Sequence, residues 1–140
     1  VLSEFTLSRP EQNPGEIMFK LITCVRRLPH LSVDEFDRHW REQHAPLIQA
    51  ESKTLKIRRY IQNSPLPDPA LQEAIRAGRS AEVADFDGCA ELCWDSREDF
   101  LAARTTPEGA LALARVLEDE RRFVDLEHSR LWFASERTIL

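Results

Sequence analysis

The segment 41–49, REQHAPLIQ, holds the side chain best suited to move a proton. His44 falls on the apolar face of a predicted helix, because four apolar residues share that face at spacings of three and four: Val33, Phe36, Trp40 and Leu47. Pro46 lacks a backbone N–H and crowds the preceding turn, so we expect the helix to end or distort there. Burial favours the neutral imidazole and a helix C-terminus the charged one, so such a ring suits general acid–base chemistry. The alternative is a core histidine that bonds a backbone carbonyl.

Tyr60 and Asp125 are candidate partners for this histidine. Tyr60, in IRRYIQN, is the only tyrosine, and its phenol can donate a proton or stabilise an enolate oxygen. The alternative is an ordinary strand aromatic. Asp125, in FVD, is a candidate to orient His44 or His128, and loop capping is the plainer alternative.

Two further polar residues and four aromatic ones complete the candidate site. Asp87 precedes a glycine, where an Asp-Gly pair either contributes a carboxylate or only makes a turn. Arg59 either pairs with an acidic substrate or a partner subunit, or is solvated at the surface. Four aromatic residues are candidates for the wall of an apolar pocket, with core packing as the alternative: Trp40, Trp94, Phe123 and Trp132.

The sequence argues against a metal site and against a disulfide. His39 and His44 are five residues apart, about 140° around an α-helix, whereas zinc-binding helices use an i, i+4 pair. We therefore expect no metal, and His39 and His30 at the surface. On one strand Cys89 and Cys93 would lie about 13 Å apart, too far for a disulfide or a shared zinc ion. An odd count of three cysteines is typical of a reducing compartment.

The composition excludes several classes of function. The net charge is −5 and the isoelectric point about 5.4, so nothing favours binding to nucleic acid or to an anionic membrane. The longest apolar runs are strand-sized, and the polar opening residues lack the pattern of a signal peptide, so we expect a cytoplasmic protein. No nucleophile elbow, P-loop or GxGxxG occurs, and we expect no cofactor.

Alternating and helical patterns predict one domain over 18–140, preceded by a tail at 1–17. The predicted strands are 18–26, 55–63, 86–94 and 129–136. Ser32 begins the first helix with a capping box to Glu35. Further helices are predicted over 98–104 and 107–120, and an inserted excursion with a short helix over 64–85.

This order, β-α-β twice, predicts an α+β fold in which helices cover one face of an antiparallel sheet. The first strand is apolar on both faces, with Phe19, Leu21 and Val25 on one and Met18, Ile22 and Cys24 on the other. A face-to-face homodimer would bury the second face.

Several segments together resemble the EthD-like family of the dimeric α+β-barrel superfamily. They are FKLITCVRRLPHLSVDEFDRHWREQHAPL, IRRYIQN, FDGCAELCWDS, TPEG and FVD, of which HAPL and FDG-AEL are the most specific. The resemblance covers roughly 18–136 and implies a ferredoxin-like βαββαβ subunit and a homodimer. The tail and the 64–85 insertion depart from the family pattern and are candidates to form a lid or to remodel the pocket mouth.

The resemblance also implies a class of chemistry. Relatives in the superfamily include cofactor-independent isomerases, cyclases, dehydratases and decarboxylases of polyketide-like or aromatic compounds. We therefore expect a small enzyme in which His44 moves a proton and Tyr60 stabilises an enol or enolate oxygen. The alternative is a ligand-binding accessory protein of a degradation pathway, with the same pocket and an inert His44.

Overall fold

A four-stranded antiparallel sheet forms the base of the structure. The computed structural model describes residues 18–140, so the predicted tail lies outside the described residues. The strands run in the order β2-β3-β1-β4, and each neighbouring pair is antiparallel. Their bounds are β1 Met18–Val25, β2 Arg59–Asn63, β3 Gly88–Trp94 and β4 Arg130–Glu136. This is the topology of two interleaved β-α-β units, and it confirms the predicted ferredoxin-like α+β fold.

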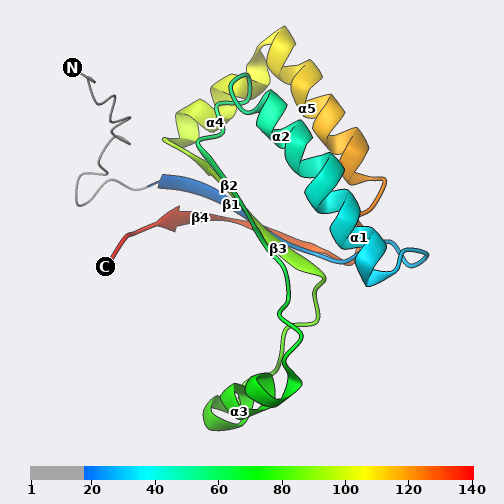
Figure 1. Cartoon of the computed structure of the whole chain (residues 1–140). Helices are drawn as coiled ribbons and strands as arrows, with labels where there is room; N and C mark the ends of the chain where they lie inside the picture. Colours follow the sequence, from blue (N-terminus) through cyan, green and yellow to red (C-terminus); the bar gives the residue numbers. More distant parts are fainter. Residues whose placement is uncertain (1–17) are drawn as a thin grey trace, which may run out of the picture.

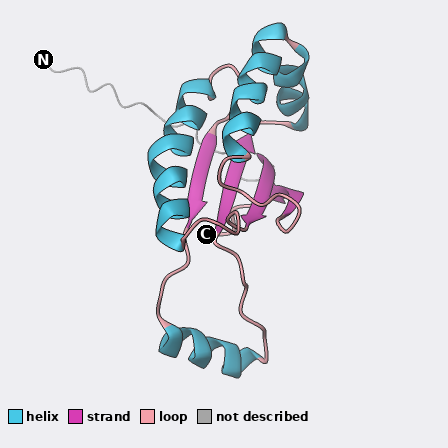
Figure 2. Cartoon of the chain, turned by 90° about the vertical axis from the view of Figure 1, so that its right-hand side faces the viewer, coloured by secondary structure: helices cyan, strands magenta, loops and turns pink. Residues whose placement is uncertain are grey.

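The main helices cover a single face of the sheet (Figures 1 and 2). The first three follow one another without a break: α1 Val33–His39, the π-helical turn η1 Trp40–His44 and α2 Ala45–Glu51. The others over the sheet are α4 Arg97–Thr105 and α5 Pro107–Glu120. The predicted capping box of Ser32 and Glu35 begins α1, and serine and threonine hydroxyls cap α4 and α5.

The second strand begins later than the alternation predicts. Residues 52–56 form a turn, in which Lys56 has a φ of 57°, because this segment leaves α2 and must reverse toward the sheet before β2 begins at Arg59. Leu55 is buried, and its carbonyl accepts a hydrogen bond of 2.8 Å from the indole Nε1 of Trp94. Leu55 is therefore apolar because it packs below the turn after α2, although in the sequence its position fits the alternating pattern of a strand.

Helix α3, Pro69–Arg79, stands apart from the rest of the chain, below the sheet in Figure 2. None of its residues is buried, although Leu71 and Ile75 lie on one side of it. No residue of the 64–85 insertion lines the cavity described below. Within one chain, the insertion therefore forms no lid over that cavity.

The open face of the sheet carries a charged network rather than a continuous apolar surface. Lys20 is buried there, and its Nζ lies 2.8 Å from Glu91 and 3.0 Å from Glu136. Cys24 stands directly opposite Cys89 on this face. Burial first, and then the neighbouring Cys24 thiol, raise the pKa of Cys89 to about 11, so Cys89 remains a thiol at neutral pH. Spacing along one strand could not reveal this cross-strand pair.

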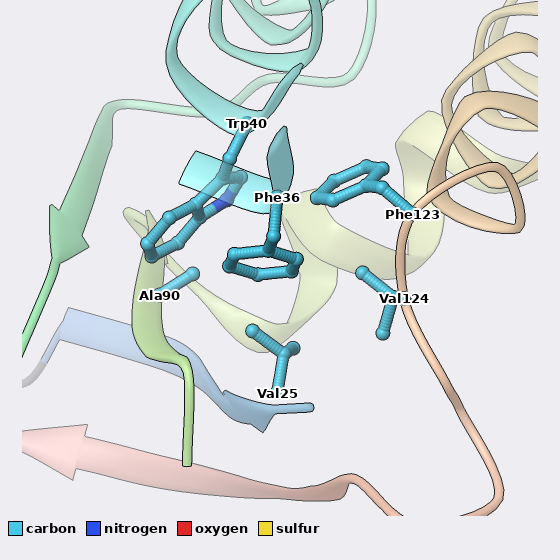
Figure 3. Close-up of a cluster of buried hydrophobic side chains, with 6 residues drawn as sticks. All are labelled: Val25, Phe36, Trp40, Ala90, Phe123 and Val124. Carbon is cyan, nitrogen blue, oxygen red and sulfur yellow. The ribbon is translucent and has the colours of Figure 1, made fainter. Parts of the chain in front are cut away.

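The main core lies between the first helix and the sheet. Figure 3 shows Phe36 at its centre, with Trp40 and Phe123 on either side and Val25 below. The ring centroids of Phe36 lie 5.7 Å from Trp40 and 5.4 Å from Phe123. A second cluster joins α2 to α5 through Ile48, Leu55, Ala112 and Val116. In the described part of the chain, no helix is long and apolar enough to cross a membrane.

Helix and sheet approach closely at Gly88, which lies under the indole of Trp40. A Cβ at Gly88 would lie 2.5 Å and 2.7 Å from two atoms of the six-membered ring of Trp40. Because this indole is buried and hydrogen-bonded, Gly88→Ala should reduce the free energy of unfolding by about 1–3 kcal/mol. Chemical denaturation of the variant measures this, and an unchanged stability would contradict the packing described.

Candidate active site

A π-helical turn turns His44 toward the inner side of the helix. The N–H of Ala45 donates to the carbonyl of Trp40, five residues earlier, which widens this turn relative to an α-helix. Pro46 follows with no N–H to donate, and α2 continues to Glu51. The helix therefore distorts near the proline, one of the two predicted outcomes, but does not end there. His44 lies inside a continuous helical segment and not at a helix C-terminus.

A buried carboxylate on α5 holds the ring. Nδ1 of His44 lies 2.8 Å from Oδ2 of Asp119, and Nε2 of His39 lies 3.0 Å from Oδ1. His44 is 6% exposed and Asp119 is 5% exposed. A carboxylate only accepts hydrogen bonds, so the neutral His44 ring carries its proton on Nδ1. Its Nε2 then has a free lone pair, and it makes no hydrogen bond within residues 18–140.

His39 is not the surface residue that α-helical geometry predicts. The π-turn adds a residue to the helical turn, so His39 and His44 both face α5 instead of diverging by 140°. The His39 ring packs on Phe123, with centroids 4.6 Å apart. Both histidines direct a ring nitrogen onto the carboxylate, and no group of three or more His, Cys, Asp or Glu side chains within residues 18–140 is arranged to hold a metal ion.

Burial and hydrogen bonding act in opposite directions on this group. Burial lowers the pKa of His44 because it disfavours the charged ring, and Asp119 offsets this effect only in part. Burial raises the pKa of Asp119, but hydrogen bonds from His44 and His39 outweigh it and the pKa lies below its usual value. Near neutral pH the pair is thus a neutral imidazole on an ionised carboxylate, the state that a general base requires.

Tyr60 is positioned as a hydrogen-bond donor to the same region. Its oxygen accepts hydrogen bonds of 3.1 Å from Nε1 of Trp40 and from Nε2 of Gln62. An oxygen that accepts two hydrogen bonds keeps its own proton to donate. Burial raises the pKa of Tyr60, so the phenol remains protonated at neutral pH. Gln62 also donates to the carbonyl of Trp40 at 2.9 Å, which ties β2 to the π-turn.

His44 and Tyr60 both line a cavity of about 170 Å³ between the helices and the sheet. This is smaller than the roughly 300–1,000 Å³ of sites for drug-sized ligands, so it suits a compound of one or two rings. Trp40, Trp94 and Phe123 lie in its wall, where the sequence predicts them. The rest of the wall is mainly aliphatic, from both the sheet and the helices: Leu21, Val25, Ile48, Leu55, Ile57, Leu92, Leu113, Val116, Leu117, Val124 and Leu131.

Three polar residues of this region were not identified from the sequence. Asp119 shares the buried face of α5 with Ala112 and Val116, so the helical spacing that singles out His44 also marks Asp119. Glu120 lines the cavity, its carboxyl group makes no hydrogen bond or ion pair within residues 18–140, and burial raises its pKa. Arg104 of α4 lines the cavity as well, and only the fold brings it there.

The structure places two predicted carboxylates away from His44. Asp125 accepts from Nδ1 of His128 at 2.8 Å, so it orients the second of its two predicted partners. Asp87 accepts from the backbone N–H of Arg27 at 2.8 Å and from its guanidinium at 2.6 Å. Both aspartates fix loops, which was the plainer alternative for each.

Two predicted substrate-binding residues also lie outside the cavity. Trp132 of β4 is 46% exposed and is absent from the cavity wall, because β-strand alternation directs it to the open face of the sheet. Arg59 faces the same way and pairs with Glu136 at 3.1 Å.

Comparison with known proteins identifies the family. The model of the EthD domain matches residues 28–127, which include α1, η1, α2 and α5. The chain belongs to the EthD family. Among solved structures, this EthD chain is similar to an ethyl tert-butyl ether D (EthD) family protein from Bacillus halodurans. That likeness has 23% identity and a TM-score of 0.56, over 85% of this chain and 98% of that one.

Two further relatives extend the comparison. A dimeric ferredoxin-like protein of unknown function from Bacteroides fragilis has 12% identity and a TM-score of 0.50, over 86% of this EthD chain and 96% of that one. The decarboxylase AgnL1 of Paecilomyces divaricatus is 24% identical over 123 residues, 87% of this chain and 80% of that protein. These likenesses support the fold.

The lowered pKa of His44 predicts a loss of stability in acid. Below the ordinary pKa of 6.5 the unfolded chain binds the proton first, so the free energy of unfolding falls as the pH is lowered. The slope from this one group is at most about 1.4 kcal/mol per pH unit. Urea titrations between pH 7.5 and 5 should show a shallower profile for His44→Gln than for the wild type. Parallel profiles would contradict the assigned protonation state.

Proposed function

We propose that this chain is a small cofactor-independent enzyme that moves a proton on an apolar carbonyl compound. The observation that carries the proposal is the pairing of His44 with buried Asp119, which leaves Nε2 of the ring unbonded at a mainly apolar cavity. The donor Tyr60 lines the same cavity. A base and a hydrogen-bond donor at one small apolar site suit the formation of an enolate.

In the proposed reaction, Nε2 of His44 takes the proton from the carbon next to the carbonyl. The C–H electron pair moves into a carbon–carbon double bond, and the carbonyl oxygen becomes an enolate oxygen that accepts from Tyr60. Asp119 stabilises the imidazolium formed on His44. Where a second double bond extends the enolate, return of the proton from the imidazolium to the far carbon completes an isomerisation. Glu120, whose pKa is raised by burial, is a second candidate proton donor in the cavity wall.

The same groups suit two related reactions. Loss of a β-hydroxyl group from the enolate, released as water when it takes a proton, would give a dehydratase. Loss of carbon dioxide from a β-keto acid would leave an enolate, and its carbon would take a proton from the Glu120 carboxyl, because neutral His44 has no proton on Nε2. The name of the Paecilomyces relative, a decarboxylase, favours the second of these. The identity of 24% leaves the reaction type as a proposal.

We further propose that the working form is a homodimer in which the open faces of two sheets meet. The Bacteroides structure is of a dimeric protein with this fold. On the open face, Ile22 and Cys24 are half-buried and Trp132 is exposed, so a second copy would cover an apolar surface around the Lys20 network. Sedimentation at micromolar concentration should give about twice the chain mass, and a monomer would contradict this assembly.

Deuterium uptake from heavy water tests the proton transfer without knowledge of the natural substrate. Wild-type protein should accelerate exchange at the carbon next to the carbonyl in at least one of a panel of one- and two-ring aromatic ketones and lactones. His44→Gln should lower the rate by about 10²–10⁴-fold, as expected for a general base. Tyr60→Phe should lower it by about 10²–10³-fold through loss of the oxygen's donor.

His128→Gln is the matched control. His128 bonds Asp125 through the same atoms and at the same 2.8 Å as His44 bonds Asp119, but its side chain is exposed. This variant should exchange at the wild-type rate. Equal rates for wild type and His44→Gln would rule out the assigned base. Ligand binding without exchange would favour the accessory binding protein.

A further inference from the structure

One wall of the cavity carries a cation that no carboxylate within residues 18–140 neutralises. Arg104 is half-buried, and one of its terminal nitrogens, Nη1, donates to the carbonyl of Phe100 at 3.1 Å. Its guanidinium carbon lies 3.6 Å from the centroid of the Phe100 ring and 5.6 Å from that of Trp94. No ion pair joins it to a described residue. Most of its five N–H donors therefore remain free.

This is unusual for a desolvated cation in this fold. Lys20, which is more deeply buried, contacts two glutamates within 3.0 Å, and the half-buried Arg27 pairs with Asp87 at 2.6 Å. Burial lowers the pKa of Arg104, but a guanidinium retains its charge near neutral pH. A desolvated charge without a partner costs free energy unless a ligand supplies the opposite charge. The two aromatic rings hold the guanidinium plane in place before any ligand arrives.

We propose that Arg104 is the anion-binding group of the cavity, and that the ligand is a flat aromatic compound bearing a carboxylate. The planar guanidinium matches a carboxylate through two parallel hydrogen bonds. The aliphatic and aromatic wall suits the ring. This proposal rests on the proposed function in one respect: the ligand is held in the same cavity that His44 faces.

The other titratable groups in the cavity wall leave Arg104 as its one cation near neutral pH. His44 and Tyr60 are neutral there, as described above. Glu120 is the one carboxyl group in the wall, and no ion pair joins it to Arg104 within residues 18–140. Burial raises the pKa of Glu120 because it disfavours the charged carboxylate. Arg104 is therefore the group in this wall that can bind an anion.

An open hollow beside the cavity is also lined by arginines. It has a volume of about 660 Å³, lies between α2 and β2, and shares Ile48, Ile57 and Tyr60 with the cavity. Its wall includes three arginines, Arg41, Arg58 and Arg59, and no carboxylate. Each of these arginines pairs with an acidic residue outside the hollow, in contrast to Arg104.

Binding of 2-naphthoate tests the proposal directly, with methyl 2-naphthoate as the uncharged probe of nearly the same shape. Quenching of the fluorescence of Trp94 and Trp40, which line the cavity, reports both. Wild type should bind the acid at least 10-fold more tightly than the ester. Arg104→Gln should weaken binding of the acid by about 10–100-fold, as expected for loss of hydrogen bonds to a charged group, and leave the ester unchanged.

Two variants control this experiment. Arg97→Gln removes the same charge from an exposed position on the same helix and should bind the acid as wild type does. Arg104→Lys retains the charge without the planar group, so its affinity should fall between those of wild type and Arg104→Gln. Circular dichroism confirms that each variant is folded.

The outcomes separate this proposal from the proposed function. Equal binding of acid and ester by wild type, unchanged binding of the acid by Arg104→Gln, or no binding of the acid at millimolar concentration would overturn the role of Arg104. None of these results affects the comparison of exchange rates between wild type and His44→Gln. Conversely, His44→Gln should still bind 2-naphthoate, even where it fails to catalyse exchange.

Discussion

The carboxylate of Asp119 is the contact on which the arrangement of the site depends. It is buried between two helices and accepts hydrogen bonds from histidines of both ends of the π-turn. An ionised carboxylate in such a position is costly unless its oxygens are bonded. The two imidazole N–H groups supply the shorter bonds, and Nη1 of Arg122 donates to Oδ1 at 3.4 Å. The cost of burying the charge is thus offset by an arrangement that also orients His44. Removal of His44 would leave Oδ2 without its donor, whereas Oδ1 is shared by His39 and Arg122.

A second set of hydrogen bonds connects the same turn to the sheet. Trp40 begins the π-turn, and its indole donates to Tyr60 while its carbonyl accepts from Gln62. The indole sits over Gly88, so the close approach of helix and β3 depends on a residue without a side chain. Hydrogen bonds and close packing therefore join the π-turn, the sheet and the phenol. This coupling explains why a small cavity can hold a base and a donor in fixed positions.

The sequence carries enough information for the fold and for part of the site. Strand alternation, the Ser32 capping box and the order of elements predict the antiparallel sheet with helices on one side. Periodicity places His44 inside, and the structure agrees. The predicted start of the second strand at residue 55 is wrong, because Leu55 is buried in the turn that follows α2 and does not pair with a neighbouring strand.

The missing parts of the site are those that arise from distortion and tertiary contact. Ideal α-helical geometry places His39 and His44 on different sides of the helix. The sequence pattern also does not indicate that a π-turn before Pro46 lets the helix continue, instead of ending there. Asp119 was within reach of periodicity, since it lies on the apolar face of α5, whereas Asp125 attracts attention only by its nearness to the last strand. Arg104 and Glu120 reach the cavity from separate helices, which no local pattern can show.

The protonation state of His44 is the central claim, and long-range ¹H–¹⁵N correlation spectra of histidine-labelled protein measure it directly. At pH 7.5 the account predicts a neutral ring with the proton on Nδ1 and an unprotonated Nε2. Asp119→Asn should lose this preference, because an amide can donate as well as accept. A ring protonated on Nε2, or on both nitrogens, would contradict the role of His44 as a base that faces the cavity.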